Sequence, residues 1–168
     1  METLNIVAST EATNAETSTL VLTNAKVSTI NVTKGHSGDT LALGTLDKSV
    51  TTLDAGAAKN IITATGGAVG MTVTLPATVA NTVTTSTKAD NVTVKGDLGT
   101  VIQVLAGGAT ATAAASDTVN VTLSSTASDF TSIIGFENVN ATIKAATATG
   151  FDDATKNNGV ENASVVNI

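Results

Sequence analysis

The sequence contains no cysteine, tryptophan, tyrosine or arginine, and it has one proline and one histidine among its 168 residues. The lack of cysteine excludes a disulfide framework, a thiol nucleophile and a thiolate zinc site. With no arginine, 2% aromatic residues and a net charge of −6, the chain lacks the basic surface and stacking platforms that bind nucleic acid. No apolar run approaches the ~20 residues of a membrane span, so no transmembrane segment is predicted. These absences favour a structural role over catalysis.

Short runs of alternating apolar and polar residues dominate the chain, and 33 of its residues are threonine. Ile30-Asn31-Val32, Met71-Thr72-Val73-Thr74-Leu75 and Val119-Asn120-Val121-Thr122-Leu123 are typical. Threonine, valine and isoleucine suit a pleated surface, and a period of two places aliphatic side chains on one face. The pattern predicts an all-β chain.

The spacing of these runs separates two β architectures. Their centres lie nine to twelve residues apart, at Leu20, Ile30, Leu41, Leu53, Ile62, Val73, Val83, Val92 and Ile102. An antiparallel β-sandwich of this size normally shows Asn-Gly or Asp-Gly turns and aromatic core residues. This stretch has neither, whereas a parallel β-helix, or β-solenoid, fills a narrow core with stacked aliphatic residues. We therefore predict a parallel β-solenoid, with the sandwich as the alternative.

The last forty residues differ from the rest, because all three phenylalanines (130, 136 and 151) lie there. We predict regular solenoid coils over 1–124 and an irregular segment over 125–168, in the same domain or as a cap. Within that segment the sequence favours a short helical turn at 128–134, a surface loop at 144–158 and a terminal strand at 165–168.

An acidic residue precedes several strands, followed by threonine or asparagine and then the first inward aliphatic residue. The phrases are Glu2-Thr3-Leu4, Asp39-Thr40-Leu41, Asp90-Asn91-Val92, Asp117-Thr118-Val119 and Glu137-Asn138-Val139. Carboxylates at such positions accept hydrogen bonds from turn backbone. In stacked coils they are also expected to line up along one edge.

Two of these phrases carry a resemblance. Ile133-Ile134-Gly135-Phe136-Glu137-Asn138-Val139-Asn140 and Glu2-Thr3-Leu4-Asn5-Ile6, in a cysteine-free chain rich in Thr, Ala, Val and Asn, resemble Gram-negative surface-layer proteins and giant adhesins of the RTX-secreted type. The resemblance implies an extracellular, cell-surface, β-rich lattice or adhesin segment, often associated with calcium. The calcium-binding nonapeptide Gly-Gly-x-Gly-x-Asp-x-(aliphatic)-x is absent, because neither Gly66-Gly67 nor Gly107-Gly108 is followed by the required Gly-x-Asp. The segment would therefore be a non-RTX part of such a protein.

Calcium is the one cofactor that the residue types suggest, since it takes six to eight oxygen ligands from carboxylates, amides and carbonyls. The candidate ligands are Asp39, Asp90, Asp117, Asp152 and Asp153. Aspartate is also an ordinary turn residue, which is the competing explanation.

No catalytic residue is predicted. His36, Ser37 and Asp39 lie close in sequence, but no nucleophile-elbow motif frames the serine, and a solvated loop is the simpler interpretation. Pairs of threonines recur at 63/65, 72/74, 82/84 and 110/112. If they stacked on one flat face, they would resemble the hydroxyl–methyl arrays of ice-binding solenoids.

The sequence thus predicts a non-enzymatic segment of a secreted surface-layer protein that associates with neighbouring subunits in a cell-surface lattice, assisted by calcium. A cell-surface polysaccharide is a second candidate partner. The alternatives are an adhesin or ice-binding region with a flat threonine-rich face and, third, a polysaccharide-acting β-helix enzyme.

Overall fold

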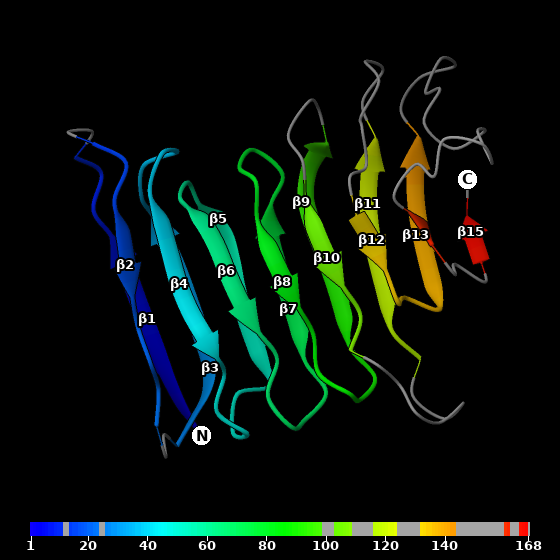
Figure 1. Cartoon of the computed structure of the whole chain (residues 1–168), viewed down its shortest axis with the longest axis horizontal. Coiled ribbons are helices and arrows are strands. Elements are labelled where there is room, and N and C mark those ends of the chain that lie inside the picture. Colours follow the sequence, from blue (N-terminus) through cyan, green and yellow to red (C-terminus); the bar gives the residue numbers. More distant parts are fainter. Residues whose placement is uncertain are drawn as a thin grey trace.

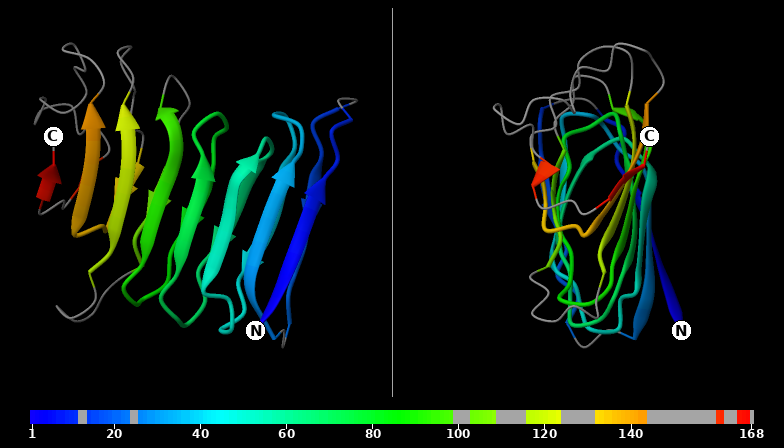
Figure 2. Two further views of the ribbon diagram at one scale, coloured as in Figure 1. Left: turned by 180° about the vertical axis from the view of Figure 1, so that it is seen from behind. Right: turned by 90° about the vertical axis from the view of Figure 1, so that its right-hand side faces the viewer.

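The computed structural model of the chain describes residues 1–11, 14–23, 26–98, 103–108, 116–123, 132–143, 160–161 and 165–167. These residues form two parallel β-sheets and no helix (Figure 1). The chain alternates between the sheets, so that odd-numbered strands build one and even-numbered strands the other. Seen end-on, the sheets are the two broad sides of a flattened coil (Figure 2).

Sheet A has eight strands, in the order β1 (Glu2–Ala8), β3 (Val27–Lys34), β5 (Thr52–Ala58), β7 (Thr72–Pro76), β9 (Asn91–Leu98), β11 (Thr118–Leu123), β13 (Asn138–Ile143) and β15 (Val165–Asn167). Sheet B has seven, in the order β14 (Val160–Glu161), β12 (Ser132–Ile134), β10 (Val104–Ala106), β8 (Thr82–Thr84), β6 (Ile61–Thr65), β4 (Thr40–Thr45) and β2 (Thr17–Thr19).

The prediction of a parallel β-solenoid is confirmed. Every strand pair in both sheets is parallel, which excludes the antiparallel sandwich. The spacing of about ten residues is half a coil, since Ile30 lies in sheet A, Leu41 in sheet B and Leu53 in sheet A again. Each coil therefore has two strands, one in each sheet.

The core consists of aliphatic side chains stacked coil upon coil. In sheet A the register aligns Ile30, Leu53, Val73, Val92, Val119 and Val139, all almost completely buried. Leu105 and Ile133 stack in the same way in sheet B. Each such side chain contributes roughly 1.5–3 kcal/mol through burial. A core this thin is filled without aromatic bulk, which explains the aromatic-poor composition.

The two sheets continue beyond residue 124. Strands β12 and β13 pair with β10 and β11, and the Phe136 side chain belongs to the same buried core. Residues 132–134 form strand β12 rather than the predicted helical turn, because Ile133 fills an inward position that stacks on Leu105. The strand predicted near the end of the chain is β15. Residues 128–131 and the loop predicted at 144–158 lie outside the described residues.

In the part of the chain that the structure describes, no helix is long and apolar enough to cross a membrane.

Candidate functional site

A ladder of acidic side chains runs along the edge where the chain enters sheet A. Asp90, Asp117 and Glu137 each stand immediately before a sheet A strand. The Oδ1 atom of Asp90 accepts the backbone N–H of Met71 at 2.5 Å, and Oδ1 of Asp117 accepts that of Asp90 at 2.9 Å. The Oε2 atom of Glu137 accepts the backbone N–H of Asp117 at 2.7 Å. The predicted alignment of carboxylates at strand entry is confirmed for these three residues, which we call the acid ladder. It is wrong for Asp39, because the same three-residue phrase there precedes β4 of sheet B and so lies on the opposite edge of the coil.

Asp117 is the most deeply buried member of the acid ladder. Its side chain is 0% exposed, and its Oδ2 atom is buried without a hydrogen-bond partner. Burial raises the pKa of Asp117 to about 6; the N–H of Asp90 works against this shift, and the negative charges of Asp90 and Glu137 add to it. A buried carboxyl group at the entry to β11 therefore titrates in mildly acidic solution.

Asp90 is held from a second side. Both of its carboxylate oxygens accept from the Ser86 hydroxyl, at 3.1 and 2.9 Å. A shallow hollow lined by residues of neighbouring coils, among them Met71, Asp90 and Thr118, opens beside it.

The entry to sheet B carries carboxamides, which the sequence analysis did not single out. The Nδ2 group of Asn81 donates to Oε1 of Gln103 at 2.9 Å, and Oδ1 of Asn81 accepts the N–H of Ile62 at 2.9 Å. Asn81 also donates to the carbonyls of Pro76 and Val79. The sequence signal that could have identified them is their position, because Asn81 and Gln103 each stand one residue before a strand, as the residues of the acid ladder do.

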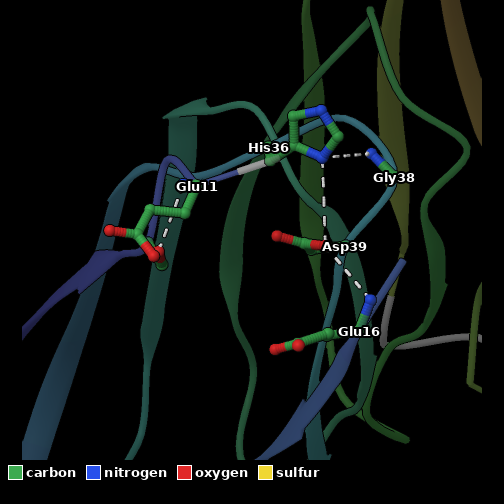
Figure 3. A network of polar contacts seen from close by, with 6 residues as sticks. Glu11, Glu16, His36, Gly38 and Asp39 are labelled. Carbon is green, nitrogen blue, oxygen red and sulfur yellow. Dashed lines mark hydrogen bonds and ion pairs between the residues drawn. The ribbon is translucent and has the colours of Figure 1, made fainter. Parts of the chain in front are cut away.

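Asp39 lies at the entry to sheet B, before β4, and so on the other side of the coil from the acid ladder. Its contacts with Glu16 and His36 are drawn in Figure 3. Its Oδ1 atom accepts the backbone N–H of Glu16 at 3.1 Å. The same oxygen lies 3.9 Å from Nδ1 of His36, which in turn accepts the N–H of Gly38 at 3.4 Å. The polar contacts of His36 are thus made with Gly38 and Asp39, within its own loop.

The structure describes three of the five predicted calcium ligands. The structure brings Asp90 and Asp117 together, places Asp39 on the opposite edge, and does not describe Asp152 and Asp153. Among the described residues, no group of three or more His, Cys, Asp or Glu is arranged to hold a metal ion. The acid ladder is not such a group, because its carboxylates accept backbone N–H groups of successive coils and do not face a common centre.

Asparagine side chains pair along the outer face of sheet A. Asn31 donates to Asn5 at 3.0 Å, Asn140 donates to Asn120 at 2.9 Å, and Asn120 donates to Asn91 at 2.9 Å. These bonds link neighbouring coils from the outside.

The threonine pairs do not share one face. Thr63 and Thr65 stack on Thr82 and Thr84 in sheet B, but the 72/74 pair lies in sheet A. A step of ten residues carries the chain to the opposite sheet, so pairs so spaced alternate between faces. The 110/112 pair lies outside the described residues.

With this geometry established, the chain was compared with known proteins. No protein-family model, curated protein or solved structure matches it. A β-solenoid fold is what the structure supports.

Proposed function

We propose that this chain is a structural, non-enzymatic segment of a secreted bacterial surface-layer protein that self-assembles into a lattice on the cell surface. The observation that carries the proposal is the use made of the buried polar side chains at the strand entries. Hydrogen bonds that join one coil to another are made by the side chains of Asp90, Asp117, Asn81 and Gln103. Such bonds build a stiff rod, which is what a lattice needs from its subunits.

The shape of the rod also favours assembly. The stack is extended, with β1 and β15 at opposite ends of its long axis (Figure 1). At the β1 end the inward side chains of Ile6, Leu20 and Leu22 pack against the core but remain only partly buried. In solenoids each coil is completed by its neighbours or by a cap, so partly covered core residues at one end favour a further contact.

Calcium is proposed as an assisting ion that links subunits rather than as an ion held inside the coil. The carboxylates available for such a role are the exposed ones, such as Asp54 and Glu11. Linking would use carboxylates of more than one subunit, since calcium takes many oxygen ligands.

Electron microscopy and light scattering of the purified chain, with and without millimolar calcium, test the proposal. We expect ordered sheets or filaments, formed at lower protein concentration when calcium is present. A chain that stays monomeric up to high concentration in both conditions would contradict the lattice function. Equal assembly with calcium and with a chelator would show that calcium does not assist the lattice.

A second candidate, an ice-binding face, is favoured by the outer surface of sheet B. Thr63 stacks on Thr82, and Thr65 stacks on Thr84, in strict register on strands about 4.8 Å apart. A freezing-point measurement decides this alternative. Thermal hysteresis that disappears on Thr82→Lys would support it, whereas a solution of the wild type without hysteresis excludes it.

A further inference from the structure

Six of the seven strands of sheet B carry no charged residue. Strands β2, β4, β6, β8, β10 and β12 contain no Asp, Glu, Lys or His, although the chain has 14 acidic residues and 8 lysines. Sheet A differs, because Lys34, Asp54 and Lys95 lie on its strands. The broad side formed by β2 to β12 is therefore neutral, and Glu161 of the end strand β14 is the one charged residue on the described strands of sheet B. The other broad side is charged.

The neutral side presents two ranks of side chains that lie in register. One rank runs through Thr63, Thr82 and Val104, and the other through Thr65, Thr84, Ala106 and Ile134. The residues between them, such as Val83 and Leu105, are buried, so the ranks point outward. We call Thr63, Thr65, Thr82, Thr84, Val104 and Ile134 the sheet B face.

The sheet B face combines methyl groups with hydroxyls. Val104 and Ile134 are 37% and 38% exposed and are two of the few large hydrophobic side chains on the described surface. Next to them the threonines present a methyl and a hydroxyl each. A surface of this kind packs against another flat sheet, since two sheets stack face to face about 10 Å apart.

We infer that the sheet B face is the lateral contact between two copies of this chain, an inference that rests on the proposed lattice function. Each copy carries a net charge of −6, so two copies repel through most of their surfaces. The sheet B face itself contains no charged residue, so contact through it brings no like charges together, although Glu161 on the neighbouring end strand β14 is in register with Ile134. The same patch on both copies then meets across a two-fold axis, as in most homodimers.

The charge pattern also argues against other occupants. A charged polymer, whether nucleic acid or acidic polysaccharide, finds no counter-charge on the sheet B face. Sheet A is the weaker candidate because its outer amides already pair with one another, as Asn31 does with Asn5 and Asn140 with Asn120. Using sheet A as the interface would require breaking those bonds or burying the charges of Asp54 and Lys95.

A matched pair of lysine substitutions tests the inference. Thr82 on β8 and Thr72 on β7 are both exposed threonines at the first position of a strand, one in each sheet. Sedimentation velocity over a concentration series should show association of the wild type and of Thr72→Lys. Thr82→Lys should weaken association at least tenfold, because two lysines would meet across the axis. Circular dichroism and thermal midpoints check that both variants remain folded.

Val104→Ser is a second variant that adds no charge and keeps the test valid if Thr82→Lys does not fold. It should weaken association severalfold by removing apolar contact. If the wild type associates and neither Thr82→Lys nor Val104→Ser weakens it, the inference is wrong while the lattice function stands. If Thr72→Lys alone blocks association, sheet A is the interface and the inference is again wrong. A wild type that never associates overturns the proposed function as well. Thermal hysteresis without association would assign the sheet B face to ice instead.

Discussion

Asp90 donates its backbone N–H to the Oδ1 atom of Asp117, the residue at the same position 27 residues further along the chain, at 2.9 Å. The bond joins two successive coils at a corner where the other carboxylate oxygen of Asp117 is buried and unpartnered. One residue thus both stabilises the stack by its hydrogen bond and stresses it by its buried charge. The balance between these effects depends on pH.

We predict that Asp117 makes the solenoid more stable in mild acid. Its pKa is raised from 3.8 to about 6, so the folded chain binds this proton more tightly than the unfolded chain does. The stability contributed by the protonated carboxyl is complete below about pH 4 and is lost as the pH rises to about 6. A shift of this size corresponds to about 3 kcal/mol.

Urea denaturation of the wild type and Asp117→Asn at a series of pH values measures this effect. The asparagine keeps an oxygen acceptor for Asp90 but does not titrate. The free energy of unfolding of the wild type should therefore fall relative to that of Asp117→Asn between pH 4 and 7. Asp54→Asn changes the charge equally at an exposed position and serves as control. A constant difference between the wild type and Asp117→Asn would show that the burial of Asp117 has no such cost.

Asn81→Ala should be strongly destabilising. Asn81 is 0% exposed and bonds to three backbone groups and to Gln103. Its loss leaves several buried polar groups unpaired, at a cost of about 3 kcal/mol or more. Asn31→Ala is the matched control, because Asn31 bonds to Asn5 on the outer face and should cost less than about 1 kcal/mol. Thermal or urea denaturation measures both changes in the free energy of unfolding. Equal changes would show that the hydrogen bonds of Asn81 at the entry to sheet B do not stabilise the fold.

Gly66 should tolerate no side chain. A Cβ atom there would lie 2.5 Å from the backbone nitrogen of Ser86 and 2.6 Å from the carbonyl carbon of Thr85, in the next coil. Gly66→Ala therefore has to push two coils apart, at a cost of about 2–3 kcal/mol or a failure to fold.

Gly44→Ala is the control for that substitution. Gly44 has open space around it but a φ of +58°, so alanine costs only about 1 kcal/mol of backbone strain. The thermal midpoint of Gly66→Ala should therefore be lower than that of Gly44→Ala. If Gly66→Ala were as stable as Gly44→Ala, the coils would not be as close at this corner as the structure places them.

Asp39 should hold the first strand of sheet B in place. Its carboxylate accepts the N–H of Glu16, the residue before β2. Asp39→Ala should speed amide hydrogen exchange at Glu16 and in β2 about tenfold, which is the effect of one lost hydrogen bond. Asp39→Asn keeps the acceptor and should exchange at nearly the wild-type rate. Unchanged exchange in Asp39→Ala would mean that backbone pairing with β4 alone secures β2.

Local patterns in the sequence were enough to predict the strands and part of the site. Inward residues such as Ile30 and Val73 were recognisable because a period of two separates buried from exposed positions on any strand. The acid ladder was recognisable because Asp90, Asp117 and Glu137 recur in the same three-residue phrase. The carboxamides at 81 and 103 were missed because they recur without a shared phrase, and only their stacking reveals them.

Other features required the coils to be closed. Whether Thr63 and Thr72 share a face depends on how many residues make a turn, which alternation alone does not determine. The helical turn predicted at 128–134 was wrong at 132–134, because stacking on β10 outweighs a local capping signal.

The sequence by itself determined that this protein is a β-solenoid with a thin aliphatic core and acidic strand entries. It did so because strand alternation and turn chemistry act between residues close along the chain. The absences noted at the outset belong to that result, since a core of stacked Val, Ile and Leu has no need of tryptophan or disulfides. Only the tertiary structure decided that there are two sheets, that Asp117 is buried against Asp90, and that all charge is kept from strands β2 to β12 of sheet B. Those properties depend on contacts between residues about twenty or more positions apart, which parallel coiling brings into register.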